Sequence, residues 1–344
     1  MSSDIACARL FAALASAEEQ LGRLEGRLAG SSFQQGWLER MALKEAASYA
    51  WNQGEIVPLD DLVLHDALMD VHPPSLALTA AHAMLRMRRK ALRAEPDRLL
   101  VWQGLAETLG PGLGSRHPLE ELLAGATMDS PPPIRRKEDT TAFPFLAALD
   151  LPQNLSDEDP EHLFGVWAEQ LERLRRDWPA LLVAALLLDL WWRLDPLPRL
   201  PYCGPILIEA VVRREKRVRL ARLHLEVGRR AASGEGYRWR ADDPALDRVT
   251  TCLTIIACGA GAGAGELDQM LIAQQLFARR LKGRRSSSRL PRLADLLLTS
   301  PIVTAPMAAE RLKLSQQAVR SMITELGGAV HEVTGRGRFR AWRI

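Results

Sequence analysis

The sequence predicts a mainly α-helical protein in which a helical body is followed by a small C-terminal unit of short helices and a short β-hairpin. Two observations lead to this fold class. Apolar residues recur at helical spacing through most of the chain, beginning with Leu14, Leu21, Leu24 and Leu28. Beyond residue 282 the helix signals become short, and two apolar runs flank a glycine-containing turn, which is typical of a hairpin.

The composition is that of a folded, soluble protein with room for two domains. The chain has 344 residues, of which 47% are hydrophobic and 25% charged. No basic segment leads into an apolar run at the N-terminus, as a secretion signal requires. The longest apolar stretch, Leu181–Leu188, is closed by Asp189 and is shorter than the roughly 20 residues of a membrane span. We therefore expect a cytoplasmic protein with no membrane partner and a buried helix at this stretch.

The charge of the chain is concentrated at its C-terminal end. Residues 279–344 contain fourteen Lys or Arg and four Asp or Glu, a net charge of +10. Because the whole chain carries only +3, the residues before 279 carry −7. This asymmetry predicts that the C-terminal end binds a polyanion.

The N-terminal region, residues 1–125, is predicted to be helical. Asp60 and Asp61 mark the start of one helix after a proline, and Ser75 begins another that extends to about residue 94. Residues 126–160 form a predicted linker or long loop, since consecutive prolines and runs of charged residues interrupt the helical pattern there.

Residues 161–281 are predicted to form a helical central region that packs against residues 1–125. Helices are expected to begin after residues 160 and 179, and a third is expected from Ile206 to about Arg230. From Cys258 to Gly265, glycine alternates with alanine. Because neither a preceding strand nor a following Lys-Ser/Thr pair accompanies this run, a phosphate loop is not indicated. We expect a flexible junction between helices.

Residues 282–344 carry the signals of a winged helix-turn-helix. A basic, serine-rich hinge that includes Arg284 and Arg285 opens the unit, and a proline-initiated helix follows it. Thr304 is positioned to cap a second helix, and Ser315 to cap a third helix that extends over residues 315–326.

The third of these helices provides the chemical argument for DNA binding. Its apolar residues share one face, which leaves polar and cationic side chains on the other. These apolar residues are Val319, Met322, Ile323 and Leu326. Gln can pair with adenine and Arg with guanine through two hydrogen bonds, and Ser or Thr can contact base edges or phosphate. With this helix in the major groove, the predicted contacting residues are Ser315, Gln316, Gln317, Arg320, Ser321 and Thr324.

A basic wing is predicted over residues 329–344. Two short strands, Val330–Val333 and Phe339–Trp342, flank the turn Thr334-Gly335-Arg336-Gly337. Guanidinium groups on this hairpin can reach phosphates or the minor groove. The arginines concerned are Arg336, Arg338, Arg340 and Arg343.

Several segments resemble those of a known family. The stretch GRRSSSRLPRLADLLLTSPIVTAPMAAERLKLSQQAV and the later ELGGAVHEVTGRGRFRAW resemble the C-terminal helix-turn-helix of an uncharacterised, often plasmid-borne bacterial protein family. The runs EIVPLDDLVLHDALMDV and PYCGPILIEAVVRR resemble the same family's domain of unknown function. Because the family has no established activity, the resemblance implies only this fold and DNA binding.

A more distant similarity is to Fic-type AMP-transferases, which also pair a helical domain with a C-terminal winged helix. Residues 31–36 are similar to their autoinhibitory segment, but Gln35 stands where the inhibitory glutamate would be. Their central motif begins His-Pro-Phe and continues through Gly-Asn-Gly-Arg, whereas this chain has Asp195-Pro196-Leu197 and no such core. Fic chemistry needs the imidazole as a base and a phosphate cradle with arginine. The departure implies a catalytically inactive domain.

No other catalytic or cofactor motif is found. His65, Asp66, Asp70 and His72 are close in sequence, but their spacing on a helix does not converge on one ion, and two prolines follow. The four cysteines lack metal-site spacing, and no GxSxG, HExxH or P-loop motif occurs. We therefore expect no metal, no cofactor and no enzymatic activity.

These patterns together predict a sequence-specific DNA-binding protein and transcriptional regulator. Helix 315–326 would enter the major groove of double-stranded DNA, and wing 329–344 would lie on its backbone. Because operators that bind such proteins are usually symmetric, we expect a homodimer. The acidic body is expected to serve dimerisation, a protein partner or an effector. Two alternatives remain open: an inactive relative of Fic-type nucleotidyl-transferases, and an adaptor whose helix-turn-helix docks on protein.

Overall fold

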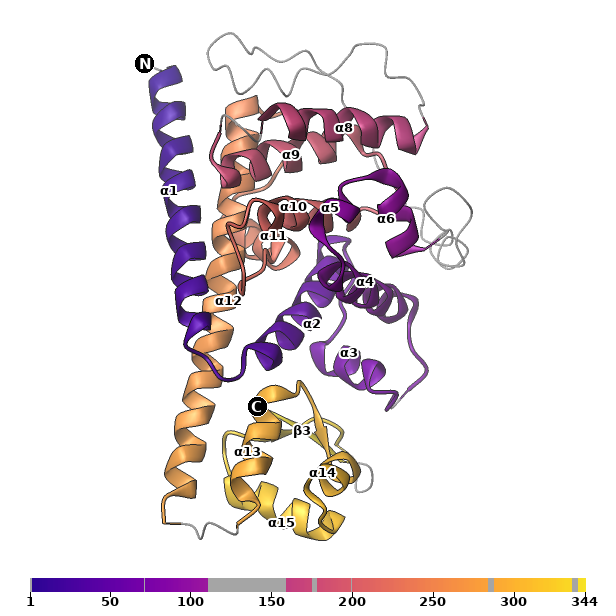
Figure 1. Ribbon diagram of the computed structural model, residues 1–344, viewed down its shortest axis with the longest axis vertical. Coiled ribbons are helices and arrows are strands. Elements are labelled where there is room, and N and C mark those ends of the chain that lie inside the picture. The colour runs from indigo at the N-terminus through magenta and orange to yellow at the C-terminus, as the bar shows by residue number, and fades with distance from the viewer. Residues whose placement is uncertain are drawn as a thin grey trace.

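The computed structural model describes residues 2–70, 72–110, 159–174, 178–198, 200–283, 288–335 and 340–344. These residues form a helical body and, at its lower end in Figure 1, a C-terminal unit of three helices and a small three-stranded sheet. The predicted fold class is therefore confirmed. Apart from residues 159 and 160, the linker predicted over residues 126–160 lies outside the described residues.

Two long helices, α1 (Ser2–Ala29) and α12 (Ala245–Leu281), run side by side in the same direction along one edge of the molecule (Figure 1). The apolar side chains that recur at helical spacing along α1 are buried against α12 and the body. Arg27 forms an ion pair with Asp268 of α12. The buried residues of α1 are Leu10, Ala17, Leu21, Leu24 and Leu28. Helix α12, with α1 packed along it, therefore extends from the body core to the C-terminal unit.

The remaining helices of the body fill the space beside α12. They are α2 (Gln34–Asn52), α3 (Leu59–Asp66), α4 (Leu76–Arg93), α5 (Pro96–Leu99), α6 (Trp102–Leu109), α8 (Pro160–Leu174), α9 (Ala180–Leu194), α10 (Cys203–Arg214) and α11 (Leu225–Gly234). Helix α9 is buried almost throughout, which confirms the core helix predicted at Leu181–Leu188. The side-chain oxygen of Ser75 accepts from the backbone N–H of Leu78 at 3.1 Å and begins α4 as predicted.

The helix predicted from Ile206 to about Arg230 is wrong, because the chain leaves the helical conformation between α10 and α11. Lys216 adopts a left-handed backbone conformation with φ 54°. The following segment is held by Glu25 of α1, whose carboxylate accepts hydrogen bonds from three consecutive backbone N–H groups, those of Arg219, Leu220 and Ala221, at 2.7–3.1 Å. Glu25, which is at least 194 residues away in sequence, thus accepts hydrogen bonds from backbone N–H groups that would donate to carbonyl groups within a continuous helix.

The flexible junction predicted from Cys258 to Gly265 is also wrong, since these residues lie inside the continuous helix α12. Glycine is needed there for close packing. A Cβ atom at Gly259 would lie 2.5 Å from the carbonyl oxygen of His224, and one at Gly228 would lie 2.0 Å from that of Ile255. The backbones of α11 and α12 therefore approach more closely than residues with side chains would allow.

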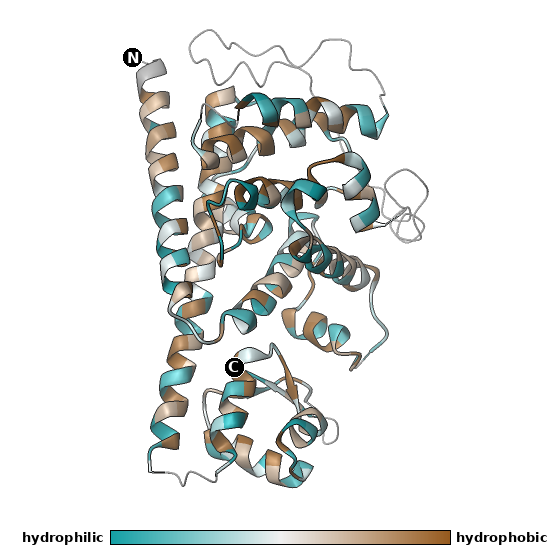
Figure 2. Cartoon of the chain, viewed as in Figure 1, coloured by the Kyte–Doolittle hydropathy of each residue, from teal (hydrophilic) through white to brown (hydrophobic). Residues whose placement is uncertain are grey.

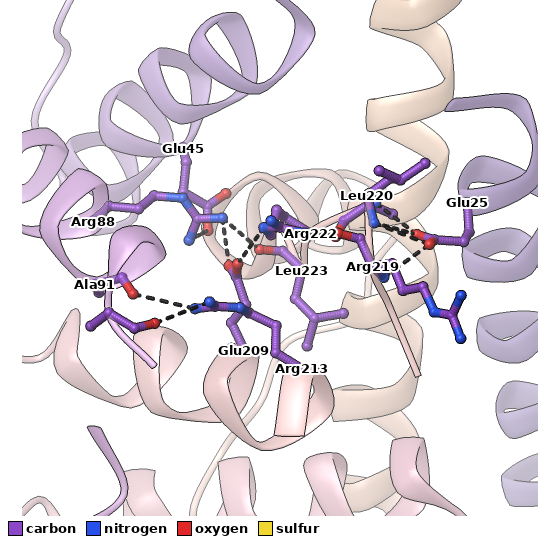
Figure 3. Close-up of polar contacts among 12 residues, drawn as sticks. Glu25, Glu45, Arg88, Ala91, Glu209, Arg213, Arg219, Leu220, Arg222 and Leu223 are labelled. Atoms are coloured by element: carbon purple, nitrogen blue, oxygen red, sulfur yellow. Dashed lines mark hydrogen bonds and ion pairs between the residues drawn. The ribbon is translucent and has the colours of Figure 1, made fainter. Parts of the chain in front are cut away.

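A network of buried charged side chains ties the helices of the body together (Figure 3). Arg88 of α4 donates to the carboxylate of Glu209 of α10 at 2.7 Å. Glu45 of α2 accepts from the backbone N–H groups of Glu226 and Val227, in the first turn of α11, at 3.0 and 3.1 Å. Burial raises the pKa of Glu45 to about 7, against the opposing effect of the nearby Arg88. The network fixes the relative positions of four helices.

Three of the four side chains whose spacing was considered for a metal site, those of His65, Asp66 and Asp70, make contacts with other side chains. His65 and Asp70 contact each other at 2.8 Å. Both carboxylate oxygens of Asp66 accept from Arg89, at 2.6 and 2.9 Å. Within the described residues, no group of three or more His, Cys, Asp or Glu is placed to hold a metal ion.

Hydrophobic and hydrophilic residues alternate along most helices of the body, as expected for amphipathic helices that share a core (Figure 2). Among the described residues, one helix, α12, is long and apolar enough to cross a membrane by length and composition alone. In the structure 61% of its most apolar window is buried inside the protein, as in the core helix of a globular domain.

Candidate nucleic-acid interface

The C-terminal unit has three helices, α13 (Leu290–Thr299), α14 (Ala305–Leu312) and α15 (Gln316–Leu326). Their apolar faces pack together, and this core is continuous with that of the body. Each helix contributes apolar side chains at helical spacing, and the sheet contributes a tryptophan. The most deeply buried members include Leu293, Leu297, Ala308, Val319, Leu326 and Trp342. This core sets the orientation of α15.

The ends of α14 and α15 follow from local side-chain chemistry. The hydroxyl of Thr304 accepts from the N–H of Met307, and that of Ser315 accepts from the N–H of Ala318, both at 3.2 Å. Both predicted caps are confirmed. Between them, Lys313 takes a left-handed conformation with φ 55°, which ends α14 and turns the chain into α15.

A three-stranded antiparallel sheet completes the unit. Its strands are β1 (Val303–Thr304), β2 (His331–Glu332) and β3 (Ala341–Arg343), arranged in the order β1-β3-β2. The β2–β3 hairpin was predicted, although its paired residues are fewer than expected. Strand β1 was not predicted, because two residues are too short for a periodic signal, and the β-branched pair Val303-Thr304 was its only sign.

All six predicted contact residues of the third helix are exposed: Ser315, Gln316, Gln317, Arg320, Ser321 and Thr324. The opposite face of α15 is buried at Val319, Ile323 and Leu326. The hydroxyl of Thr324 donates to the carbonyl oxygen of Arg320 at 3.1 Å, within the helix. The helix therefore presents a polar, cationic surface that is free to meet another molecule.

The arginines predicted for the wing and hinge have different positions. Arg340 is half-buried, with its guanidinium 5.4 Å from the ring centre of Trp342 and 3.7 Å from the carboxylate of Glu332. Arg343 instead faces the body, where it pairs with Asp60 of α3 at 3.0 Å. Its guanidinium therefore already has an acidic partner in the body, and a contact of Arg343 with DNA stays a prediction. The other predicted cations, Arg284, Arg285, Arg336 and Arg338, lie outside the described residues.

The body contacts the C-terminal unit at the C-terminal end of α13. Arg40 of α2 is buried and donates to the carbonyl oxygens of Leu297, Leu298 and Ser300 at 2.7–3.1 Å. One turn earlier, a Cβ atom at Gly36 would lie 2.1 Å from the carbonyl oxygen of Leu298. Helix α2 thus packs directly on the backbone of α13, an arrangement that sequence periodicity gave no means to predict.

The charge of Arg40 is balanced from α12. Its guanidinium lies 3.8 Å from the carboxylate of Glu266, which also pairs with Lys44. Burial lowers the pKa of Arg40 to about 10, with Glu266 acting in the opposite direction. Arg40 therefore keeps its charge at neutral pH, and the joint between the body and the C-terminal unit involves α2, α12 and α13 together.

Comparison with known proteins agrees with this division of the chain. Residues 290–344 match the model of a helix-turn-helix DNA binding domain, and residues 157–282 match that of a protein of unknown function, DUF1612. The chain is 31% identical over 359 residues to the "Uncharacterized protein y4cF" of Sinorhizobium fredii, an alignment that covers 94% of this chain and 93% of that protein. This chain belongs to the same family as that protein and carries a DUF1612 domain. Its C-terminal unit is a DNA-binding domain.

In this DUF1612 protein, both segments that were compared with Fic-type enzymes lie within the described residues. Residues 31–33 connect α1 to α2, with Phe33 buried, and residues 34–36 form the first turn of α2, with Gly36 against α13. Asp195 ends α9 in a left-handed conformation with φ 45°. Burial raises the pKa of its carboxyl group.

Proposed function

We propose that this protein is a sequence-specific transcriptional regulator that reads double-stranded DNA with α15 in the major groove. One observation carries the proposal: the polar face of α15 is exposed along its whole length while its apolar face forms the core of the DNA-binding domain. Gln316, Gln317 and Arg320 lie in the N-terminal half of the helix, the half that approaches base edges in this class of domain.

The remaining parts of the proposal follow from the residue types of the hinge and the wing and from the symmetry that operators usually have. Basic side chains of the hinge and the wing, Arg284, Arg285, Arg336, Arg338 and Arg340, contact the phosphate backbone and position α15 without reading sequence. The protein acts as a homodimer in the cytoplasm, since two-fold operators place two recognition helices about one helical turn apart. Residues 1–125 and 161–281 form a non-catalytic body that receives an effector or protein partner, and residues 282–344 bind DNA.

The joint at Arg40 supports a regulatory role for the body. Because α2 and α12 hold α13 through buried contacts, a change in the body is transmitted to the orientation of α15 rather than lost in a flexible tether. A regulator that senses an effector needs such a physical connection between its two parts.

The decisive experiment is capture of genomic DNA fragments by the purified full-length protein, followed by fluorescence anisotropy on the enriched duplexes at 50 mM salt. We expect a small set of related sequences and an affinity that falls tens- to thousands-fold between 50 and 200 mM salt. Absence of binding both to random duplexes and to the captured fragments would show that the helix-turn-helix serves another purpose, such as docking on a protein.

A further inference from the structure

The C-terminal end of α12 and the residue that follows it carry a second basic surface, which precedes the helix-turn-helix domain matched at residues 290–344. Arg279, Arg280 and Lys282 are all exposed, and no ion pair is found for any of them among the residues that the structure describes. The earlier part of α12 lies in the body core, so the position of this basic end is fixed by the body. We call these three residues the basic end of α12.

The basic end of α12 lies beside the C-terminus of α15. Figure 1 shows α12 reaching the same outer end of the molecule as α15, and the two helices are in contact. Gly327 ends α15 with φ 73°, and the guanidinium of Arg280 is 3.6 Å from the place where a Cβ atom on Gly327 would be. The surface presented by α15 therefore continues onto α12.

The length of α15 indicates what this cationic end can reach. A helix of 11 residues is about 16 Å long, whereas the major groove is about 12 Å wide. When α15 spans the groove, the groups at its two ends therefore overlie the two phosphate strands that border it. Arg311 and Lys313 are exposed just before its N-terminus. At its C-terminus, Arg280 is the nearest described cation.

We propose that the basic end of α12 binds the phosphates that border the groove at the C-terminal end of α15, so that the DUF1612 body itself contacts DNA. This inference rests on the proposed entry of α15 into the major groove. The contact extends the DNA footprint beyond the helix-turn-helix and ties the body to the duplex. Because phosphates carry no sequence information, it adds affinity without changing which operator is preferred.

The test is DNA binding by the full-length triple variant Arg279→Ala/Arg280→Ala/Lys282→Ala, measured by anisotropy from 50 to 300 mM salt on a captured operator and on a random duplex. The matched control is Arg86→Ala/Lys90→Ala/Arg93→Ala, which removes three exposed cations from α4 and changes the net charge equally. Thermal unfolding of both variants checks that the body remains folded.

We expect the α12 triple variant to lose about 10- to 100-fold in affinity on both duplexes at 150 mM salt. The slope of log affinity against log salt should become shallower by about 1 to 3, roughly 0.9 for each phosphate that the protein no longer neutralises. The ratio between operator and random duplex should be unchanged, as should binding by the α4 variant.

Two results would overturn the inference. If the α12 variant binds like the parent, or if the α4 variant loses as much affinity, the basic end of α12 has no contact of its own with DNA. In either case α15 still reads DNA, and the proposed function survives. Failure of the parent protein to bind any duplex would overturn both proposals. Because this result is seen in the parent alone, it is readily told apart from a failure of the α12 contact, which appears only when the variants are compared.

Discussion

The guanidinium of Arg40 lies against the C-terminal end of α13, where it donates to the carbonyl oxygen of Leu298 at 3.1 Å. Carbonyl groups in the last turn of a helix have no partner within the helix. A side chain of the body thus caps a helix of the DNA-binding domain, and the bond spans 258 residues of sequence. The DNA-binding domain is therefore held in one orientation relative to the body.

Arg40→Ala should lower the free energy of unfolding by about 3 kcal/mol, because it leaves buried carbonyl groups of α13 without a donor and removes one of the two cations that pair with Glu266. Urea denaturation measures this loss, and hydrogen exchange should show faster opening of α13 than of α9. Arg40→Lys keeps the positive charge but supplies fewer donors in a fixed fork, so an intermediate loss is expected. Equal exchange of α13 in the parent and Arg40→Ala would contradict the capping role.

Two glycines of α12, two positions apart, should respond in opposite ways to the same change. Gly259→Ala places a Cβ atom 2.5 Å from the carbonyl oxygen of His224, so α11 must move, at a cost of about 1–3 kcal/mol. Gly261→Ala meets nothing within 4 Å and should stabilise the helix by about 1 kcal/mol. Thermal or urea unfolding of the two variants decides the point. A similar change in both would mean that helix propensity, rather than packing, governs this stretch.

The features that were predictable from sequence are those whose partners lie nearby in the chain. Ser315 and Thr304 cap helices because each hydroxyl accepts from an N–H three residues later. Such a short spacing can be recognised directly in the sequence. The exposed and buried faces of α15 follow from its own periodicity for the same reason.

The features that were missed depend on residues far apart. Glycine and alanine in α12 resemble a flexible segment unless one knows that His224 packs on Gly259. The break after α10 is stabilised by Glu25 of α1, and Arg343 meets Asp60 of α3. Periodicity states which face of a helix is apolar, but not which element that face or its charges will meet.

Ser315 offers a way to separate folding from DNA binding. Ser315→Asn and Ser315→Asp can both still accept the N–H of Ala318, so each should keep stability within about 0.5 kcal/mol of the parent. The aspartate adds a negative charge where α15 would approach the phosphates, and should weaken binding to every duplex about 10-fold or more. The asparagine should bind much like the parent. Equal affinity of the two variants in anisotropy would place the N-terminus of α15 away from DNA.

The two halves of the proposed interface should differ in what they discriminate. Gln317→Ala and Arg320→Ala should lower the preference for the operator over random duplex, by about 1–3 kcal/mol for each base that is no longer read. Arg338→Ala should weaken binding to all duplexes alike and make the salt dependence shallower by about 1. Anisotropy on both duplexes separates the two effects. Operator preference that survives both changes in α15 would rule out reading by this helix.

The stability of the body should fall in mild acid because of His224. Its ring is buried and neither ring nitrogen has a hydrogen-bond partner among the described residues. Burial, together with the nearby cations Arg88, Arg222 and Lys44, holds the pKa of His224 well below its usual 6.5. Below pH 6.5 the unfolded chain therefore binds a proton that the native protein does not. The stability that this group contributes is present above pH 6.5 and is lost as the pH falls.

Comparison of the parent with His224→Phe isolates this effect, since phenylalanine keeps an apolar ring against Trp37 and cannot take a proton. Between pH 7.5 and pH 5 the parent should lose stability relative to His224→Phe, by at most about 1.4 kcal/mol for each pH unit below 6.5. The titration of Glu45, whose pKa is raised and which therefore favours the native state as the pH falls, is present in both proteins and cancels to first order. Urea unfolding at the two pH values should show His224→Phe gaining stability relative to the parent in acid. If the free energies of unfolding of the parent and His224→Phe differed by the same amount at both pH values, His224 would take up a proton as readily in the native protein as in the unfolded chain. Its burial beside α12 would then not affect its titration.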